Sequence, residues 1–380
     1  MIDGTADRRF DGVRQAFESC FADGLEHGAA VAVMVDGKLV VDLWGGHADA
    51  AKTKPWQRDT LVNLWSATKG ITALAIAMLV ERGRLDYAAP LAKVWPAFAA
   101  RGKENITLDQ VLSHQAGLHG LDVEMSDADF YAWHPFVEAL AAMAPLWEPG
   151  SRCVYHPVTY GHLAGEALRR ADGRSVGRFI AEEIAGPLDL SFFVGLPAAE
   201  ERRVAEMRAE PSASAWVSEG LAGPYHHCFR NPTITPLKPN ERAWRAAELP
   251  AVNGQGDARS LATMYGLLAR GGELARRRLI SQEGIARATA ERFRGQDPSL
   301  GVNTAYGAGF RIDDPTYGPS SAGPDATAGH FGHSGWGGTI AFADPAARLG
   351  FAFVTARMQD FDTGIDPRRQ RLTDAVYAAL

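Results

Sequence analysis

The spacing of hydrophobic residues predicts regular structure from the start of the chain. Apolar side chains recur every three or four positions over about residues 7–25, which predicts an amphipathic helix. Two apolar runs, 29–35 and 38–44, flank Asp36-Gly37, and an Asp-Gly pair between such runs is a strong signal of a β-hairpin. The chain is therefore expected to begin with a helix and two antiparallel strands.

The most hydrophobic segment, residues 71–80, is apolar on every side. A helix with this pattern lies in the interior of a protein, since it has no polar face for solvent. The segment is too short, and too closely followed by Glu81 and Arg82, to span a bilayer. We expect a buried helix that ends near Gly83, a residue common at helix C-termini.

After this helix, the hydrophobic pattern first predicts further helices and then, toward the end of the chain, short strands. Residues 71–250 consist mainly of helical segments separated by Gly/Pro loops, and a further helix is predicted over 257–269. Short strands and a closing helix to Leu380 follow, the helix with Asp366 as its N-cap and Pro367 at its first position. The strands are predicted at residues 306–312, 339–343 and 349–355.

This order, with strands at both ends and helices in the middle, predicts an α/β (α+β) fold. We expect one antiparallel sheet, built from both ends of the chain and flanked by the terminal helices. Residues 1–70 and 255–380 would form this discontinuous α/β domain. Residues 71–254 would form a mainly helical domain inserted between its two halves.

Composition narrows the classes of function. The net charge of -6 over 380 residues, without a block of basic residues, argues against a nucleic-acid surface. The three cysteines are widely spaced and form no C-x-x-C, which suggests reduced thiols. The N-terminal residues lack the apolar core of a signal peptide. We therefore expect a cytoplasmic protein without a membrane span, and composition leaves its oligomeric state open.

The stretch Ser66-Ala67-Thr68-Lys69 reads S-x-x-K and opens the apolar helix. Three residues are just under one helical turn, so the hydroxyl and the amine share one face. A buried, neutral lysine could take the proton of the serine, although its pKa would have to fall by about three units from about 10.4. Alternatively, Ser66 is only a helix cap and Lys69 is solvated. The cost of burying an unpaired ammonium at the start of an apolar helix weakens that alternative.

Two later stretches could supply partners. Tyr155 follows the turn residues Glu148-Pro149-Gly150 and could be presented into a cleft, although most such tyrosines only pack. The stretch 333–338, His-Ser-Gly-Trp-Gly-Gly, precedes a predicted strand, and its small residues would let a ligand approach the backbone. A β-bulge or tight strand entry explains the same glycines.

Other motifs do not indicate chemistry. Residues 173–177 match G-x-S-x-G, but a helical segment precedes them where the motif needs a strand, so Ser175 is interpreted as a helix cap. The eleven histidines include no H-E-x-x-H and no Cys/His pair with ligand spacing. Gly254-Gln255-Gly256 is not flanked by the strand and the acidic residue that a dinucleotide-binding site requires. We predict neither a metal nor a cofactor.

Taken in order, these motifs resemble those of class C β-lactamases, penicillin-binding proteins and the related family VIII carboxylesterases. The resemblance extends from about residue 25 to the C-terminus. It rests on Ser66-x-x-Lys69, Tyr155 and His333-Ser334-Gly335, together with the flanking stretches 83–86 (Gly-Arg-Leu-Asp), 112–118 (Leu-Ser-His-Gln-Ala-Gly-Leu), 148–150 (Glu-Pro-Gly) and 187–190 (Pro-Leu-Asp-Leu).

The resemblance implies an α/β domain beside an all-helical domain, with the active site in the cleft between them. It makes Ser66 the acylated nucleophile and Lys69 with Tyr155 the proton-transfer pair. It assigns the oxyanion hole to the backbone N–H groups of Ser66 and Trp336. His333, Ser334, Gly335 and Trp336 would bind substrate, or in the case of His333 tune Tyr155 through a hydrogen bond. Whether Lys69 or Tyr155 is the primary base stays open.

The chain departs from the β-lactamase pattern in ways that favour esters. The middle motif Tyr-x-Asn is here Tyr155-His156-Pro157, and proline has no side-chain amide to orient an acylamino substrate. The third motif Lys-Thr-Gly begins here with His333, which weakens the fixed positive charge for a substrate carboxylate. The tryptophan at 336 with its two glycines resembles the esterase branch.

The sequence therefore predicts a serine carboxylesterase for small or short-chain acyl esters, whose partner is a small-molecule ester and which needs no cofactor. Three alternatives stay open: a β-lactamase or D-Ala peptidase, an acyltransferase, and a non-catalytic binding protein on the same fold. Weak β-lactam hydrolysis could accompany esterase activity. The sequence does not indicate the natural ester or the stereoselectivity.

Overall fold

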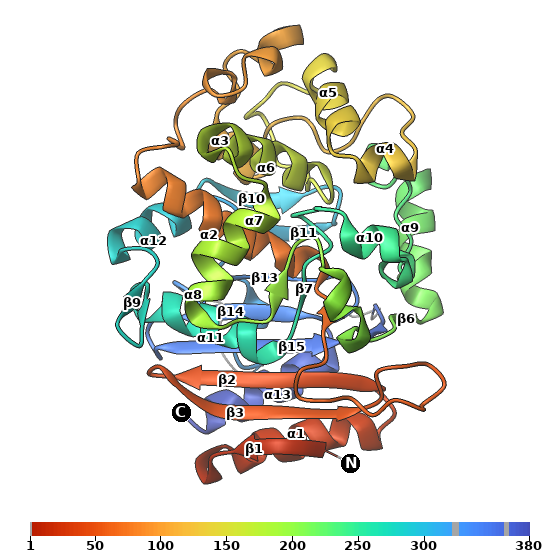
Figure 1. Cartoon of the computed structure of the whole chain (residues 1–380), viewed down its shortest axis with the longest axis vertical. Helices are drawn as coiled ribbons and strands as arrows, with labels where there is room; N and C mark the ends of the chain where they lie inside the picture. Colours follow the sequence, from red (N-terminus) through yellow and green to blue (C-terminus); the bar gives the residue numbers. More distant parts are fainter. Residues whose placement is uncertain (1, 321–326, 361–364) are drawn as a thin grey trace.

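The computed structural model describes residues 2–320, 327–360 and 365–380. Its central feature is a nine-stranded antiparallel sheet with the strand order β1-β3-β2-β15-β14-β13-β12-β11-β10 (Figure 1). The strands are β1 (Ile2–Ala6), β2 (Gly28–Val35), β3 (Lys38–Gly46), β10 (Phe293–Asp297), β11 (Val302–Tyr306), β12 (Arg311–Ile312), β13 (Phe331–Ser334), β14 (Ile340–Asp344) and β15 (Leu349–Thr355).

Strands from the two ends of the chain meet in the middle of this sheet. There β2 pairs with β15, from Val35 opposite Leu349 to Ala29 opposite Thr355. The predicted hairpin joins β2 to β3, and both turn residues adopt the left-handed conformation that a two-residue hairpin turn needs, with φ of 49° at Asp36 and 79° at Gly37. The prediction of one antiparallel sheet built from both ends is confirmed.

Helices cover both faces of the sheet. On one face, α1 (Asp11–Ala22) packs against α13 (Pro367–Ala378), and both cover an apolar layer of strand residues. On the other face, α11 (Ala258–Ala269) lies against β2, β14 and β15. The predicted cap of α13 is confirmed, because the Asp366 carboxylate accepts a hydrogen bond of 2.9 Å from the Arg368 backbone N–H.

The apolar segment forms helix α2 (Thr68–Glu81), and every residue from Thr68 to Val80 is buried, as predicted. It packs against α6 (Thr159–Asp172), α7 (Val176–Ile180) and α12 (Gln282–Thr289), and it crosses the middle of the molecule in the view of Figure 1. The other helices are α3 (Leu108–Leu112), α4 (Asp127–Tyr131), α5 (His134–Ala142), α6 (Thr159–Asp172), α7 (Val176–Ile180), α8 (Gly186–Leu188), α9 (Pro211–Ala222), α10 (Arg242–Ala246) and α12 (Gln282–Thr289).

Short strands tie the remaining segments together. A three-stranded sheet has the order β4-β7-β5, β6 pairs with β16 in parallel, and β8 with β9 forms a small antiparallel pair. Their bounds are β4 (Val62–Asn63), β5 (Phe192–Phe193), β6 (Arg208–Ala209), β7 (Gln255–Gly256), β8 (Glu273–Leu274), β9 (Arg277–Arg278) and β16 (Arg357–Met358).

Some details of the sequence prediction are wrong. The single strand expected over 306–312 is two strands, β11 and β12, because the chain turns between them and Gly309 adopts a left-handed φ of 89°. The stretch 333–338 precedes strand β14, as predicted, but the sequence missed that His333 and Ser334 themselves end a further strand, β13. The sequence also missed β1, whose polar stretch Ile2–Ala6 covers the edge of the sheet.

The division into domains 1–70 with 255–380 and 71–254 stays a prediction. Within the described residues, no helix combines the length and the apolar character needed to cross a membrane.

Candidate active site

Ser66 lies in a short 3-10 turn, Trp65–Ala67, that leads directly into α2. Its side chain caps neither this turn nor the helix, so the helix-cap alternative is wrong. The preceding residue, Trp65, has a φ of 50°, a left-handed conformation that is rare and strained for a bulky side chain. Such strain persists only where packing enforces it, and here it sets the position from which the Ser66 hydroxyl reaches a pocket.

Lys69 is fully buried, and its Nζ lies 3.0 Å from Ser66 Oγ. The same nitrogen donates hydrogen bonds to the backbone carbonyls of Pro157, at 2.7 Å, and Ala251, at 3.0 Å. Desolvation by burial holds the pKa of Lys69 well below its ordinary value of 10.5. A neutral amine has two N–H groups and one lone pair. Because carbonyls can only accept, the two N–H groups go to Pro157 and Ala251, and the lone pair faces Ser66.

Tyr155 is buried beside this pair. Lys69 Nζ lies 4.8 Å from the centre of its ring, and a hydrogen bond joins its side chain to that of Ser66. Burial raises the pKa of Tyr155 above its ordinary value of 10, although the hydrogen bond with Ser66 opposes the shift. At neutral pH Tyr155 is therefore a phenol and can donate a proton.

The surroundings of Tyr155 fix its position. The buried carboxylate of Asp297, at the end of β10, accepts a hydrogen bond of 2.9 Å from the Tyr155 backbone N–H. Cys228 Sγ donates to the Tyr155 carbonyl, and the His114 ring lies 4.7 Å from the tyrosine ring. His156, its neighbour, turns away: His156 Nδ1 pairs with the Val154 carbonyl at 2.7 Å and Nε2 accepts from Leu118 N–H.

The third motif lies against the backbone that precedes Ser66. A Cβ atom on Gly335 would lie 2.3 Å from the carbonyl oxygen of Leu64, so only glycine permits this approach. The Trp65 and Trp336 rings pack with their centres 4.9 Å apart. These contacts hold the third motif against the segment that leads to Ser66.

His333 also lies beside Tyr155, with ring centres 6.2 Å apart, but it is not hydrogen-bonded to it. His333 Nδ1 pairs with the Ser334 carbonyl at 2.7 Å, and Nε2 has no hydrogen-bond partner among the described residues. The hydrogen bond to Tyr155 suggested by the sequence is therefore wrong. Burial holds the pKa of His333 well below 6.5, so the ring is neutral at pH 7.

A pocket of about 490 Å³ brings the motifs together. Besides the predicted residues, its walls include groups that the sequence did not single out. The pocket is lined by Ser66, Tyr155, Leu300, Val302, Tyr306, Arg311, His333, Ser334, Gly335, Trp336, Gly337, Gly338, Gln359, Asp360, Asp366 and Arg369.

Arg311 contributes a positive charge to this pocket that the sequence did not predict. Its guanidinium forms an ion pair of 2.8 Å with Asp314 and lies 3.5 Å from Ser334 Oγ. The pocket thus keeps a fixed positive group although His333 is neutral. No motif marks Arg311, since it lies alone in a short strand more than 20 residues before the third motif. Only the pairing of β12 with β13 brings it to the site.

Ser175 behaves as predicted for a helix cap. Its Oγ accepts a hydrogen bond from Arg178 N–H at the start of α7 and donates to Glu248. No group of three or more side chains suited to hold a metal ion occurs in the ranges that the structure describes.

Comparison with known proteins places this geometry in a family. The beta-lactamase family model matches residues 13–375, almost the whole chain. The chain belongs to the beta-lactamase family. The predicted fold class and family resemblance are thereby confirmed.

Individual members of the family extend over most of the same length. The esterase/beta-lactamase LipL of Mycobacterium tuberculosis is 37% identical over 366 residues, covering 93% of this chain and 83% of LipL. The crystal structure of a family VIII carboxylesterase superposes with a TM-score of 0.91, 42% identity and full coverage of both chains. A penicillin-binding protein homologue from Caulobacter crescentus gives a TM-score of 0.89, 43% identity and the same coverage.

Proposed function

We propose that this chain is a serine carboxylesterase that hydrolyses small or short-chain acyl esters through an acyl-enzyme on Ser66. The observation that carries the proposal is the buried amine of Lys69, whose lone pair faces Ser66 Oγ while two carbonyls take its N–H groups. Ser66 opens on a pocket of about 490 Å³, a volume suited to a small ligand. The names of LipL and of the carboxylesterase support an ester as the substrate class.

In the acylation step, Ser66 Oγ attacks the ester carbonyl as Lys69 accepts its proton. The bond between the carbonyl carbon and the alcohol oxygen then breaks. The phenol of Tyr155 protonates the departing alkoxide and recovers its proton from Lys69. Lys69 is therefore the primary base, because its lowered pKa leaves it neutral when the raised pKa of Tyr155 keeps that residue protonated.

The negative charge that forms on the carbonyl oxygen needs two donors. We assign these to the backbone N–H groups of Ser66 and Trp336, supported by the contacts of Gly335 with Leu64 and of Trp336 with Trp65. Loss of one such donor typically costs about 10²–10³ in kcat, or about 3–4 kcal/mol.

In the deacylation step, water takes the place of the alcohol. Its proton passes through Tyr155 to Lys69 as the oxygen attacks the acyl carbon, and Lys69 returns a proton to Ser66 Oγ when the acid leaves. The same pair thus serves both halves of the reaction. His333, Ser334 and Gly335 shape the wall of the pocket against which the substrate lies.

Hydrolysis of β-lactams is the second candidate, and Arg311 is the observation that favours it. A guanidinium 3.5 Å from Ser334 could attract the carboxylate of a β-lactam, although Asp314 already pairs with it. The middle motif argues the other way, because Pro157 has no side-chain amide and its carbonyl is bound by Lys69. We expect esters to be the better substrates.

The experiment compares ester and β-lactam turnover in three proteins. Wild type, Ser66→Ala and Ser175→Ala are assayed with p-nitrophenyl butyrate and with nitrocefin. Wild type and Ser175→Ala are expected to hydrolyse the ester with similar kcat, and Ser66→Ala is expected to lose it. Equal turnover by Ser66→Ala would reject the proposal, and faster turnover of nitrocefin than of the ester would favour the second candidate.

We further propose that the substrate of this enzyme is a small-molecule ester and that the enzyme acts in the cytoplasm. The three cysteines are buried and form no disulfide, which supports a reducing compartment.

A further inference from the structure

The turn that carries Trp336 is held from behind by the start of helix α13. Within the turn, Gly335 N–H donates to the Thr339 carbonyl at 2.7 Å, and Gly338 N–H lies 3.5 Å from the Gly335 carbonyl. The side chains of Arg368 and Arg369 reach this turn and donate to four of its carbonyl groups. This arrangement bears directly on the proposed oxyanion donor, so the inference rests on the proposed function.

Arg369 binds the peptide group that contains the Trp336 N–H. Its Nη2 donates to the Gly335 carbonyl at 3.1 Å. That carbonyl and the Trp336 N–H belong to one planar, trans peptide unit, in which C=O and N–H point in opposite directions. Fixing the carbonyl toward Arg369 therefore fixes the direction of the N–H. The bond is charge-assisted, and it is stronger than a neutral one.

The other contacts of Arg369 hold both ends of the turn. Its Nε donates to the Gly338 carbonyl at 2.6 Å, and Nη2 also lies 3.2 Å from the Thr339 carbonyl. On the other side, Trp336 Nε1 donates to the Asp360 carboxylate at 3.3 Å. The peptide and the side chain of Trp336 are thus held separately, and rotation of the peptide would break the contact with Arg369.

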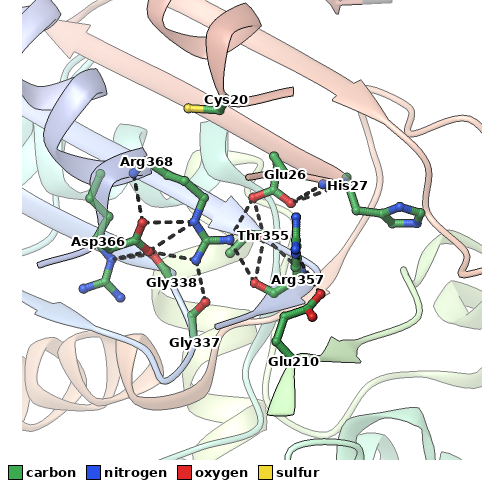
Figure 2. Close-up of polar contacts among 12 residues, drawn as sticks. Cys20, Glu26, His27, Glu210, Gly337, Gly338, Thr355, Arg357, Asp366 and Arg368 are labelled. Carbon is green, nitrogen blue, oxygen red and sulfur yellow. Dashed lines mark hydrogen bonds and ion pairs between the residues drawn. The ribbon is translucent and has the colours of Figure 1, made fainter. Parts of the chain in front are cut away.

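A buried ion network supports the helix start that carries Arg369 (Figure 2). The side chain of Arg368 is fully buried between Glu26, at 3.1 Å, and Asp366, at 2.8 Å. Its Nη2 donates to the Gly337 carbonyl at 2.8 Å, as Figure 2 shows. Gly338 has a φ of 143°, which side chains rarely adopt, and a Cβ atom there would lie 2.4 Å from this nitrogen, so glycine is favoured at that position.

Glu26 extends this network to the sheet. Its Oε2 accepts from the Thr355 hydroxyl at 2.8 Å, at the end of β15, and Oε1 accepts from the His27 N–H at 2.7 Å (Figure 2). The network therefore ties the segment before β2, the end of β15 and the start of α13 together. A buried network of this kind can hold the start of α13, and with it Arg369, in a fixed position, as the precise placement of a catalytic group requires.

We propose that Arg369 is a positioning residue of the esterase: it orients the Gly335–Trp336 peptide so that the Trp336 N–H faces the oxyanion, and the Arg368 network holds it in place. Although Arg369 also borders the pocket, its proposed role is exerted through this peptide rather than through contact with the substrate. Its loss should therefore affect the transition state, where the oxygen is charged, more than the bound ester.

The test replaces Arg369 by methionine and by lysine, with Arg371→Met as the matched control. Arg371 lies on the same helix and carries the same charge, but it contacts Ser19 of α1 and Asp23, the residue after α1, rather than the turn. Each protein is assayed with p-nitrophenyl butyrate for kcat and KM. Inhibition by butylboronic acid is measured in parallel, since its tetrahedral adduct on serine presents an oxygen to the oxyanion hole.

We expect Arg369→Met to lose about 10²-fold in kcat with KM changed less than about threefold, because one donor is misaligned. Boronic acid inhibition should weaken in step with kcat/KM. Arg369→Lys should recover part of the loss, and Arg371→Met should match wild type in kcat. An unchanged kcat in Arg369→Met, a rise in KM alone, or an equal loss in Arg371→Met would overturn the proposal. Absence of turnover in wild type would instead reject the proposed function.

Discussion

Lys69 Nζ lies 3.0 Å from Ser66 Oγ, and the carbonyls of Pro157 and Ala251 accept two further hydrogen bonds from the same nitrogen. This arrangement supports our proposal that Lys69 acts as the base. An ammonium would be surrounded by acceptors but would have no ion-pair partner among the described residues, whereas a neutral amine leaves its lone pair on the serine side. Burial favours the neutral form.

The first prediction concerns the pH dependence of the reaction. Since Lys69 must be neutral, kcat/KM for ethyl butyrate should rise with pH through the lowered pKa of Lys69, which lies well below 10.5, and then stay level up to about pH 9. If tyrosinate were the base, the rate would keep rising toward the raised pKa of Tyr155, above 10. A pH-stat titration of initial rates separates the two profiles.

The second prediction concerns stability. Between the lowered pKa of folded Lys69 and the ordinary value of 10.5, the unfolded chain binds one more proton than the folded protein, so the free energy of unfolding rises with pH. This contribution is absent from Lys69→Met. In the pH range between the lowered pKa of folded Lys69 and its ordinary value, the stability of wild type relative to the variant should rise by about 1.4 kcal/mol per pH unit.

Urea unfolding at several pH values in this window measures the difference directly. The comparison between the two proteins cancels groups whose titration is shared. Parallel pH profiles would mean that Lys69 keeps its proton in the folded protein, which contradicts its role as the resting base.

The third prediction concerns Tyr155→Phe. Removal of the hydroxyl takes away the acid for the leaving alcohol, so kcat should fall by about 10²–10⁴, while the ring keeps its packing against His114. Tyr87→Phe is the control, because Tyr87 is buried and its hydroxyl has no partner among the described residues. Steady-state kinetics with ethyl butyrate should show normal turnover in the control, and wild-type kcat in Tyr155→Phe would remove Tyr155 from the mechanism.

The fourth prediction concerns Gly335→Ala. The new methyl group would lie 2.3 Å from the Leu64 carbonyl oxygen, so β13 and the segment before Ser66 must separate. The two oxyanion donors would move apart, and we expect kcat to fall by at least about 10²-fold. The control is Gly12→Ala on α1, where a Cβ atom meets nothing within 4 Å and alanine favours the helix. Similar kcat in both variants would show that this contact does not position the site.

Several residues of the site could be predicted because they lie in short sequence motifs that can be recognised without a structure. Ser66, Tyr155 and His333 were singled out from motif and order, and all three line one pocket. The buried helix α2 followed from an apolar run without a polar face. In both cases local sequence alone carries the signal.

The remainder depends on contacts that local sequence does not encode. The two groups that hold Lys69 besides Ser66 are backbone carbonyls, which any residue type could provide at 157 and 251. Three arginines near the start of α13 have different partners once the helix is packed: Arg369 contacts the Gly335 carbonyl, Arg368 contacts Glu26 and Arg371 contacts Asp23. Their sequence alone does not distinguish them. Arg311 reaches the pocket through strand pairing.

Intact-mass measurement of protein quenched with acid during turnover of p-nitrophenyl butyrate would show whether Ser66 carries the acyl group. We expect a covalent butyryl adduct in wild type, mapped by peptide sequencing to Ser66, and no adduct in Ser66→Ala. Turnover without any adduct on Ser66, or an adduct that persists in Ser66→Ala, would contradict the proposed acyl-enzyme on Ser66.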